Sequence, residues 1–250
     1  MVVNVLRSLY ISASGILAQR KAMDVLTNNL ANVTTTGFKR DTLLTRSFSE
    51  VLIGRINDPE QNASGIGRMT FGVHADDVVT GFEQGSMEPT GRVADLAIAG
   101  DGFFVVETPQ GLRFTRNGNF QVDGQGFLCT CEGYFVRGAN GRINVGSQDF
   151  LVDQNGNITT AAGGTARLQL VTFADPNVLT KVGNNLFSGP LTAMNATGQV
   201  RQGWLEGSNV DLGTEMVSMI TVQRNYEANQ RMVNMINDTL QKTVNEVGRV

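Results

Sequence analysis

Glycine and proline are concentrated in the middle of this 250-residue chain, and this division most constrains how the chain can fold. Of the 29 glycines, 26 lie between Gly54 and Gly213, and all 5 prolines lie in the same part. Both residues interrupt helices, proline through its missing N–H and fixed φ, glycine through its backbone freedom. The two ends, roughly residues 2–36 and 211–247, can therefore form long helices, whereas the middle is expected to contain turns and strands.

The C-terminal segment carries a heptad pattern, in which apolar residues recur at alternating spacings of three and four. In this register, eight of the eleven positions from Leu212 to Val247 are apolar. The positions are Leu212, Met216, Met219, Gln223, Tyr226, Gln230, Val233, Asn237, Leu240, Val244 and Val247. A stripe with this period is typical of helices that pack as coiled coils.

The N-terminal segment repeats the pattern, with seven apolar residues at nine positions. The positions are Val2, Leu6, Leu9, Ala13, Ile16, Arg20, Met23, Thr27 and Leu30. A single stripe would also fit a buried helix of a globular core, but two matching stripes at opposite ends favour a helical bundle, within one subunit or between subunits. The polar positions Arg20, Gln223, Gln230 and Asn237 fit a seam in which a buried polar side chain penalises slipped pairings.

The middle of the chain is predicted to be all-β, like a sandwich or a barrel. Short apolar runs such as GFFVVE (102–107), LRFTR (112–116), FLCT (127–130), YFVR (134–137) and RLQLVTF (167–173) predict strands. Five dipeptides between such runs predict hairpin turns. They are Asp101-Gly102, Asn117-Gly118, Asp123-Gly124, Asn140-Gly141 and Asn155-Gly156.

The expected fold class is mixed α and β, with terminal helices that pair as a coiled-coil-like bundle. Residues 1–40 are predicted to form an N-terminal assembly helix and signature, and residues 41–70 a flexible connector without periodicity. Residues 71–203 are predicted to form the β-rich domain, and residues 204–250 the C-terminal assembly helix.

The sequence offers little for catalysis or for binding a cofactor or metal. His74 is the only histidine, and Cys129 and Cys131 are the only cysteines, so a usual four-ligand zinc site cannot be completed. We interpret both cysteines as reduced, partly buried thiols. Asp153 begins a D-x-N-x-N run like that of a calcium loop, but Ile158 stands where the loop needs glycine, so a turn is predicted. We therefore predict no catalytic residue, no cofactor and no metal.

Charge and hydropathy argue against nucleic acid and membranes as partners. The formal net charge is −3, which provides no basic surface for nucleic acid. No apolar run approaches the roughly 20 residues of a membrane-spanning helix, so an integral membrane protein is not expected. The stripes also lack flanking Lys and Arg clusters, which disfavours a membrane-surface helix. The N-terminal MVVNVLRSLYISASG lacks the features of a secretory signal, and we expect synthesis as a soluble cytoplasmic chain.

Two motifs near the chain ends resemble the signatures of the bacterial flagellar rod and hook family. The run ANVTTTGFK (31–39) resembles its N-terminal signature A-N-x-x-T-x-G-F-K/R. The run GWLEGSNVDLGTEMVSMITVQRNYEANQRMV (203–233) resembles the C-terminal one, E-x-S-N-V followed by E-M-V-x-M-I-x-x-Q-R-x-Y-E. The middle segments LAIAGDGFFVV (96–106) and FTRNGNFQVDGQG (114–126) also match. The pattern is most similar to the distal rod branch, and the proximal rod and hook-type branches are the alternatives.

The resemblance implies an axial structural protein, not an enzyme, which polymerises helically with itself and transmits torque from motor to hook. It implies adjacent rod and hook proteins as partners, export unfolded through the flagellar type III apparatus without a cleaved signal, and a place in the basal body. The terminal helices would pack with those of neighbouring subunits. The predicted assembly residues are Leu6, Leu9, Ile16, Met23, Asn28, Leu30, Asn32, Gly37, Phe38, Asn209, Leu212, Met216, Met219, Tyr226, Val233 and Leu240.

The asparagine-rich end of the N-terminal helix is interpreted as a polar interface. Asn28 and Asn32 lie four residues apart on one helical face and are predicted to bond across subunits. Thr34–Thr36 would end the helix gradually, and Gly37 would take a left-handed cap. A different hypothesis is a carbohydrate- or peptidoglycan-binding β domain carried on oligomerising helices, which would need exposed aromatic side chains along a groove.

Overall fold

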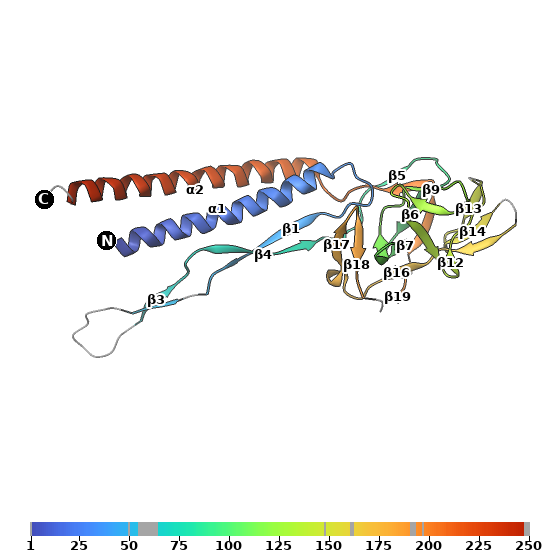
Figure 1. Cartoon of the computed structure of the whole chain (residues 1–250), viewed down its shortest axis with the longest axis horizontal. Helices are drawn as coiled ribbons and strands as arrows, with labels where there is room; N and C mark the ends of the chain where they lie inside the picture. Colours follow the sequence, from blue (N-terminus) through green and yellow to red (C-terminus); the bar gives the residue numbers. More distant parts are fainter. Residues whose placement is uncertain are drawn as a thin grey trace. The chain divides into compact units, whose positions relative to one another are not determined.

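The structure is a computed structural model that describes residues 2–49, 51–54, 65–147, 149–160, 163–190, 194–196 and 198–247. The fold is mixed, with a helix at each end and a β-rich middle, as the sequence predicts (Figure 1). The chain divides into two compact units. Unit 1 consists of Met1–Leu30, Asp41–Val79 and Leu212–Val250, and unit 2 of Ala31–Arg40 and Thr80–Asp211.

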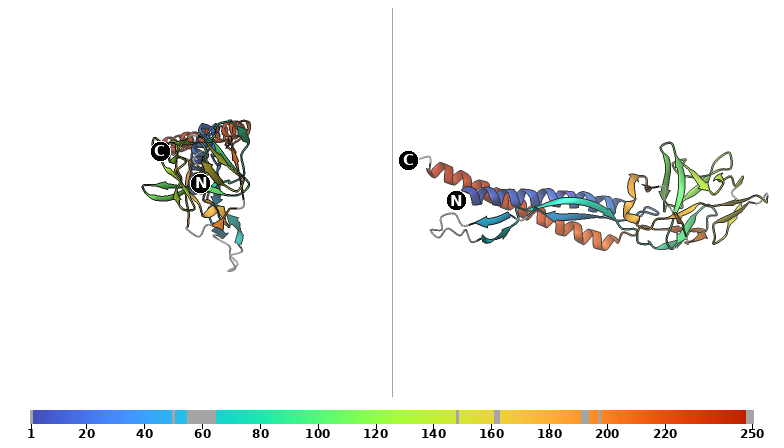
Figure 2. Two further views of the ribbon diagram at one scale, coloured as in Figure 1. Left: turned by 90° about the vertical axis from the view of Figure 1, so that its right-hand side faces the viewer. Right: turned by 90° about the horizontal axis from the view of Figure 1, so that it is seen from below.

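Unit 1 contains the two long helices, α1 (Val2–Ala31) and α2 (Leu212–Val247). They lie next to each other in Figure 1 and cross in the right-hand view of Figure 2. Both fall within the segments that contain almost no helix breakers, and α1 ends at Ala31, before the threonines at which the sequence predicts a gradual end. Among the described residues, neither helix is long and apolar enough to cross a membrane.

Unit 1 also contains strands where the sequence predicts an irregular connector. β1 (Asp41–Ser47) pairs with β4 (Val73–Thr80), and β2 (Val51–Gly54) pairs antiparallel with β3 (Gly65–Met69). The structure thus differs from the predicted connector over residues 41–70, and residues 55–64 lie outside the described part. The reason is that β1 gains its partner from beyond the segment, which local periodicity does not reveal.

The largest sheet of unit 2 has the strand order β17-β18-β8-β7-β11-β10-β9. Outside this path, β12 pairs with β11, β16 pairs with β7, and β19 pairs with β16. The strands of the main path are β7 (Phe103–Thr108), β8 (Gly111–Thr115), β9 (Phe120–Val122), β10 (Leu128–Thr130), β11 (Phe135–Gly138), β17 (Thr180–Gly183) and β18 (Leu186–Ser188). The strands outside the main path are β12 (Gly141–Arg142), β16 (Leu170–Thr172) and β19 (Met194–Asn195).

Smaller sheets complete unit 2. β13 (Phe150–Val152), β14 (Asn157–Thr160) and β15 (Thr165–Arg167) form an antiparallel meander. β5 (Met87–Pro89) pairs with β21 (Trp204–Glu206), and β6 (Leu96–Ala99) pairs with β20 (Gln199–Gln202). A 3-10 turn, η1 (Pro176–Val178), precedes β17. The pairings β5–β21 and β6–β20 bring the beginning of the domain beside its end.

Three of the five predicted hairpin turns are confirmed and two are wrong. Asp123-Gly124, Asn140-Gly141 and Asn155-Gly156 lie at turns between strands that pair with each other. Asp101-Gly102 and Asn117-Gly118 instead link strands that pair elsewhere: β6 with β20, and β8 with β7 and β18. Asp101-Gly102 therefore marks a crossing between two sheets, whereas Asn117-Gly118 connects two strands of one sheet that do not pair with each other. The dipeptide alone cannot distinguish either case from a hairpin.

Strand β7 is the centre of the core, because both of its faces are buried. Phe104 and Val106 point into the larger apolar cluster, and Phe103 and Val105 point into the second. Side chains alternate between faces along a strand, so an apolar run such as FFVV is expected where neither face meets water. The predicted strand is confirmed, and its uniform hydrophobicity reflects its central position.

Candidate functional site: the two terminal segments

The N-terminal signature forms the transition from α1 into unit 2. After Ala31 the chain turns, and Gly37 adopts φ +66°, which confirms the predicted left-handed conformation. Its N–H donates to Glu206 O at 2.7 Å. A Cβ at Gly37 would lie only 2.5 Å from Asn117 N and 2.6 Å from Arg116 C. Glycine is thus required for both its backbone conformation and its close approach to the β domain.

A buried cluster of charges lies directly behind this turn. Lys39 Nζ donates to Glu206 Oε1 at 2.6 Å, and Arg116 Nη1 donates to Glu206 Oε2 at 3.2 Å. The three side chains are at most 4% exposed. Lys39 Nζ also donates to Glu83 O at 2.6 Å. We call residues 31–40 and 204–211, together with Arg116, the clasp, since this cluster joins both signatures to the β domain.

Two cations share one carboxylate in the clasp, and the cluster is therefore costly to bury. Burial lowers the pKa of the Lys39 ammonium from its ordinary value, although Glu206 acts in the opposite direction. Within the described residues, Arg116 Nε is buried without a hydrogen-bond partner, and the guanidinium carbon lies 5.2 Å from the Phe103 ring centre. Removing Glu206 would leave two buried cations without their counter-ion.

Asn209 of the C-terminal signature completes the clasp through its side-chain amide. Its Oδ1 accepts from Arg40 N at 2.7 Å, and its Nδ2 donates to Gly81 O at 2.9 Å and Glu83 O at 3.1 Å. Asparagine can satisfy a donor and two acceptors at once. One side chain thereby holds the end of the N-terminal signature, the segment after β4 and the chain leading into α2.

In unit 1, a second buried polar contact connects the two helices. Asn29 Nδ2 donates to Asp41 O at 2.8 Å and to Glu215 Oε2 at 3.3 Å, and Asn29 Oδ1 accepts from Asp41 N at 3.0 Å. Farther along, α1 and α2 approach closely at Gly15, where a Cβ would lie 3.0 Å from Asn229 Nδ2. Between these two contacts, the residue number falls from 29 to 15 along α1 and rises from 215 to 229 along α2. The two helices are therefore antiparallel.

The covered face of α2 follows a heptad period, but half of its positions differ from the predicted stripe. Met219, Tyr226, Val233 and Leu240 are half-buried within one chain, as a packed stripe requires. The alternate positions of the covered face are Glu215, Val222, Asn229 and Ile236, whereas the predicted Met216, Gln223, Gln230 and Asn237 are exposed. Arg20 of α1 is exposed as well. Within one chain, these polar side chains therefore do not lie between the two helices.

The predicted assembly residues are distributed over both units. On the helices, the half-buried ones are Leu9, Ile16, Met23, Leu30, Met219, Tyr226, Val233 and Leu240, and the exposed ones are Asn28, Leu212 and Met216. The side chain of Leu6 lies outside the described part. In unit 2, Asn32 accepts from Thr35 Oγ1 at 3.2 Å, and Gly37, Phe38 and Asn209 belong to the clasp, where Phe38 is buried. Their role between subunits stays a prediction.

Sequence reasoning missed several residues that form the buried polar contacts of these sites. Lys39 and Glu206 are part of the quoted signatures, so their presence in both motifs was the available signal. Arg116 lies in the quoted segment 114–126, and Asn29 lies in the asparagine-rich end of the N-terminal helix. Neither motif indicates the partner of its residue, because each meets that partner through long-range packing.

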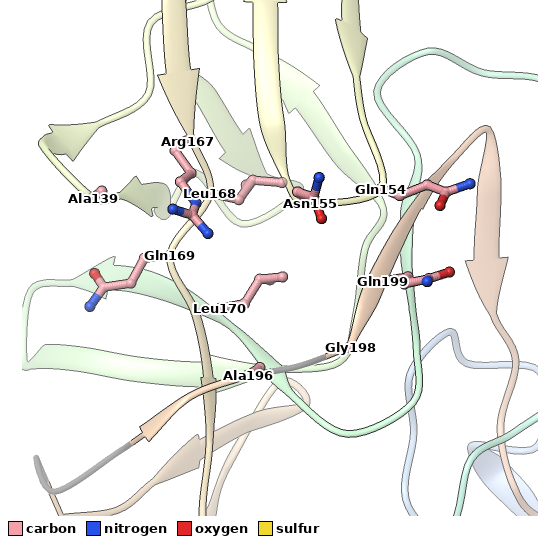
Figure 3. Close-up of a pocket in the computed structure, with 10 residues that line it drawn as sticks. All are labelled: Ala139, Gln154, Asn155, Arg167, Leu168, Gln169, Leu170, Ala196, Gly198 and Gln199. Carbon is pink, nitrogen blue, oxygen red and sulfur yellow. The ribbon is translucent and has the colours of Figure 1, made fainter.

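A pocket of unit 2 bears on the carbohydrate hypothesis (Figure 3). It lies among the β13–β14 turn, β15, β16 and β20, and its polar groups are amides and one guanidinium. The lining residues are Ala139, Gln154, Asn155, Arg167, Leu168, Gln169, Leu170, Ala196, Gly198 and Gln199. Among the described residues, the lining contains neither an aromatic ring to stack on a sugar nor a carboxylate pair to hydrolyse one, so this pocket gives the hypothesis no support.

The other residues that the sequence raises as candidate metal ligands include the two cysteines and Asp153. Cys129 and Cys131 are both free; Cys129 is buried, as expected, but Cys131 is exposed. Asp153 accepts from Asn155 N at 2.9 Å and Asn157 N at 2.8 Å, which confirms the predicted turn. No group of His, Cys, Asp and Glu that could hold a metal occurs in the part of the chain that the structure describes.

Three family profiles match the chain in the segments that form these sites. Residues 9–39 match the profile described as flagella basal body rod protein. Residues 97–160 match the flagellar hook protein FlgE/F/G D1 domain, and residues 201–246 match the flagellar basal body rod FlgEFG protein C-terminal profile. The first and third profiles together include Gly37, Lys39, Glu206 and Asn209.

Whole-length relatives agree with the profiles. The flagellar basal-body rod protein FlgG of Bacillus subtilis is 35% identical, over 96% of this chain and 98% of the relative. FlgG of Agrobacterium fabrum is 34% identical over 91% and 94% of the two chains. The flagellar basal-body rod protein FlgF of Caulobacter vibrioides is 32% identical over 97% and 98%. The chain belongs to the family of flagellar basal-body rod proteins.

Proposed function

We propose that this protein is a subunit of the distal rod that polymerises helically through its terminal helices and transmits torque from motor to hook. Family membership makes it a structural protein of the basal-body rod and not an enzyme. Identity of 34–35% to relatives named FlgG, the distal rod protein, supports the distal assignment over the proximal and hook-type branches. The expected partners are further copies of this chain and the adjacent rod and hook proteins.

The observation that carries helical assembly is the apolar face that α2 leaves exposed at its N-terminal end. Leu212, Met216, Val217 and Ile220 are 47–66% exposed within one chain. At 100° per residue, Leu212, Met216 and Ile220 lie within about one-third of the helical circumference. Val217 lies at the edge of this face. A contiguous exposed apolar patch on a helix typically marks an interaction site.

The pairing of α1 and α2 supports a coiled-coil-like arrangement. The contacts Asn29–Glu215 and Gly15–Asn229 are separated by 14 residues on each helix, which is two heptads and about 21 Å of helix. The helix pair would then present Met216 and Ile220 outward to a neighbouring subunit. In unit 2, core clusters on both faces of β7 support a sandwich-like or partly closed barrel arrangement.

A charge placed on the exposed face tests the assembly role. Ile220→Glu should leave unit 2 folded but prevent purified protein from forming sedimentable polymers, since a carboxylate on the interface would have to be desolvated. Asn225→Glu places the same charge on an exposed polar position of α2 and serves as the control. Equal polymerisation of the two variants would argue against this face as the interface.

Deletion of the gene tests the place in the rod. We expect basal bodies that stop short of the hook in electron micrographs, and a complete rod with an attached hook would refute the assignment. We further infer export through the flagellar type III apparatus without a cleaved signal. An intact N-terminus in protein recovered from basal bodies, determined by mass spectrometry, is the expected result.

A further inference from the structure

The clasp joins parts of the chain that are far apart in the sequence. Lys39 and Glu206 are separated by 167 residues, and Arg40 and Asn209 by 169. The strands of the apolar core, from β6 to β20, lie between these two segments. Because synthesis runs from the N-terminus, residues 204–211 are the last part of unit 2 to be made.

Without residues 204–211, several groups of unit 2 lack the partners that they have in the closed structure. Lys39 and Arg116 lack their shared carboxylate, and Gly37 N–H lacks its acceptor. β5 lacks its strand partner β21. Burying a charge without its counter-ion costs several kilocalories per mole in effect, so Lys39 and Arg116 must remain in contact with water.

The hydrogen bonds around Glu206 connect the clasp to the rest of the unit. Glu206 Oε1 also accepts from Gly85 N at 3.1 Å, and Gly207 N donates to Ser86 O at 2.7 Å. On the other side, Lys181 Nζ donates to Lys39 O at 2.6 Å. The clasp thus touches the segment before β5, the end of β8 and strand β17, rather than a single neighbouring loop.

We propose that the clasp is a closing device, which lets unit 2 fold stably only when residues 204–211 join Lys39 and Arg116. The clasp then opens only when the whole unit unfolds. During synthesis the unit stays open until Glu206 is present, which is near the end of the chain. This inference concerns the folding of one chain and does not rest on rod assembly.

Native-state hydrogen exchange on the full-length protein tests the coupling. Glu206→Gln keeps the shape of the side chain but removes its charge. We expect the protection of the β7 amides Phe104 and Val106 to fall by the same factor as that of Gly37, on the order of 100-fold. Glu107→Gln, which disrupts the exposed pair with Arg142 at 2.8 Å, should change protection by less than about fivefold.

The location of the lost protection decides the outcome. Loss confined to residues 31–40 and 204–211, with β7 unchanged, would show that the clasp opens locally and would overturn the proposal. Unchanged protection everywhere would overturn it too. If Glu206→Gln does not fold, Asn209→Ala is measured in the same way, because it removes only uncharged contacts of the clasp. The same two outcomes then apply to that variant.

Discussion

Replacing Gly37 by alanine should destabilise unit 2 by two separable effects. The residue has φ +66°, and a side chain in the left-handed region costs about 1–2 kcal/mol. The new Cβ would also lie 2.5 Å from Asn117 N and 2.8 Å from Arg116 O. Both are backbone atoms that cannot rotate away, and overpacking of this kind costs about 1–3 kcal/mol. The expected loss is therefore about 2–5 kcal/mol, a large part of the stability of a typical domain.

Gly91 provides a matched control for the backbone term. It has φ +71° in the same unit, and a Cβ built there meets no atom within 4 Å. Gly91→Ala should therefore cost only the conformational part, about 1–2 kcal/mol. The difference between the two variants measures the close approach between the N-terminal signature and the end of β8.

Urea unfolding followed by Trp204 fluorescence measures both losses. Trp204 is the only tryptophan and lies in β21, so its emission reports on unit 2. The unfolding free energies follow from the midpoint and the slope of each transition. Equal losses for Gly37→Ala and Gly91→Ala would refute the steric argument, and a neutral Gly37→Ala would refute the need for glycine altogether.

Three further predictions concern unit 2. Iodoacetamide should label the exposed Cys131 before Cys129, because burial raises the pKa of the Cys129 thiol and limits access; mass spectrometry showing equal rates would contradict this. Hydrogen bonds lower the pKa of Asp153, so its stabilisation is present above about pH 4 and lost as the pH falls below that value. Asp153→Asn should flatten the acid limb of the stability profile, and an unchanged limb would argue against that role. Gly118→Ala should unfold unit 2, since its Cβ would overlap a main-chain oxygen of β6, whereas Gly124→Ala should be nearly neutral in thermal melts.

Local sequence determined the two helices and the central strands of unit 2, but not the strands of unit 1. The scarcity of glycine and the absence of proline at the ends predict α1 and α2, because helices need only local hydrogen bonds and few interruptions. Gly37 predicts the left-handed turn that follows α1, and the threonines before it predict the end of the helix to within a few residues. Apolar runs predict β7, β8, β10 and β11, since alternation and burial act on consecutive residues. The resemblance of the two signatures also predicts the family.

Tertiary structure alone decided which elements meet. The heptad period of α2 is compatible with either Val222 or Gln223 in the covered face, because a 3.5-residue repeat leaves neighbouring positions almost equivalent until a partner helix is placed. Asn117-Gly118 and Asp123-Gly124 have the same form in the sequence, but only the second closes a hairpin, since strand pairing depends on distant partners. For the same reason, no local pattern could predict that Lys39, Arg116 and Glu206 meet, because Lys39 and Glu206 are 167 residues apart in the sequence.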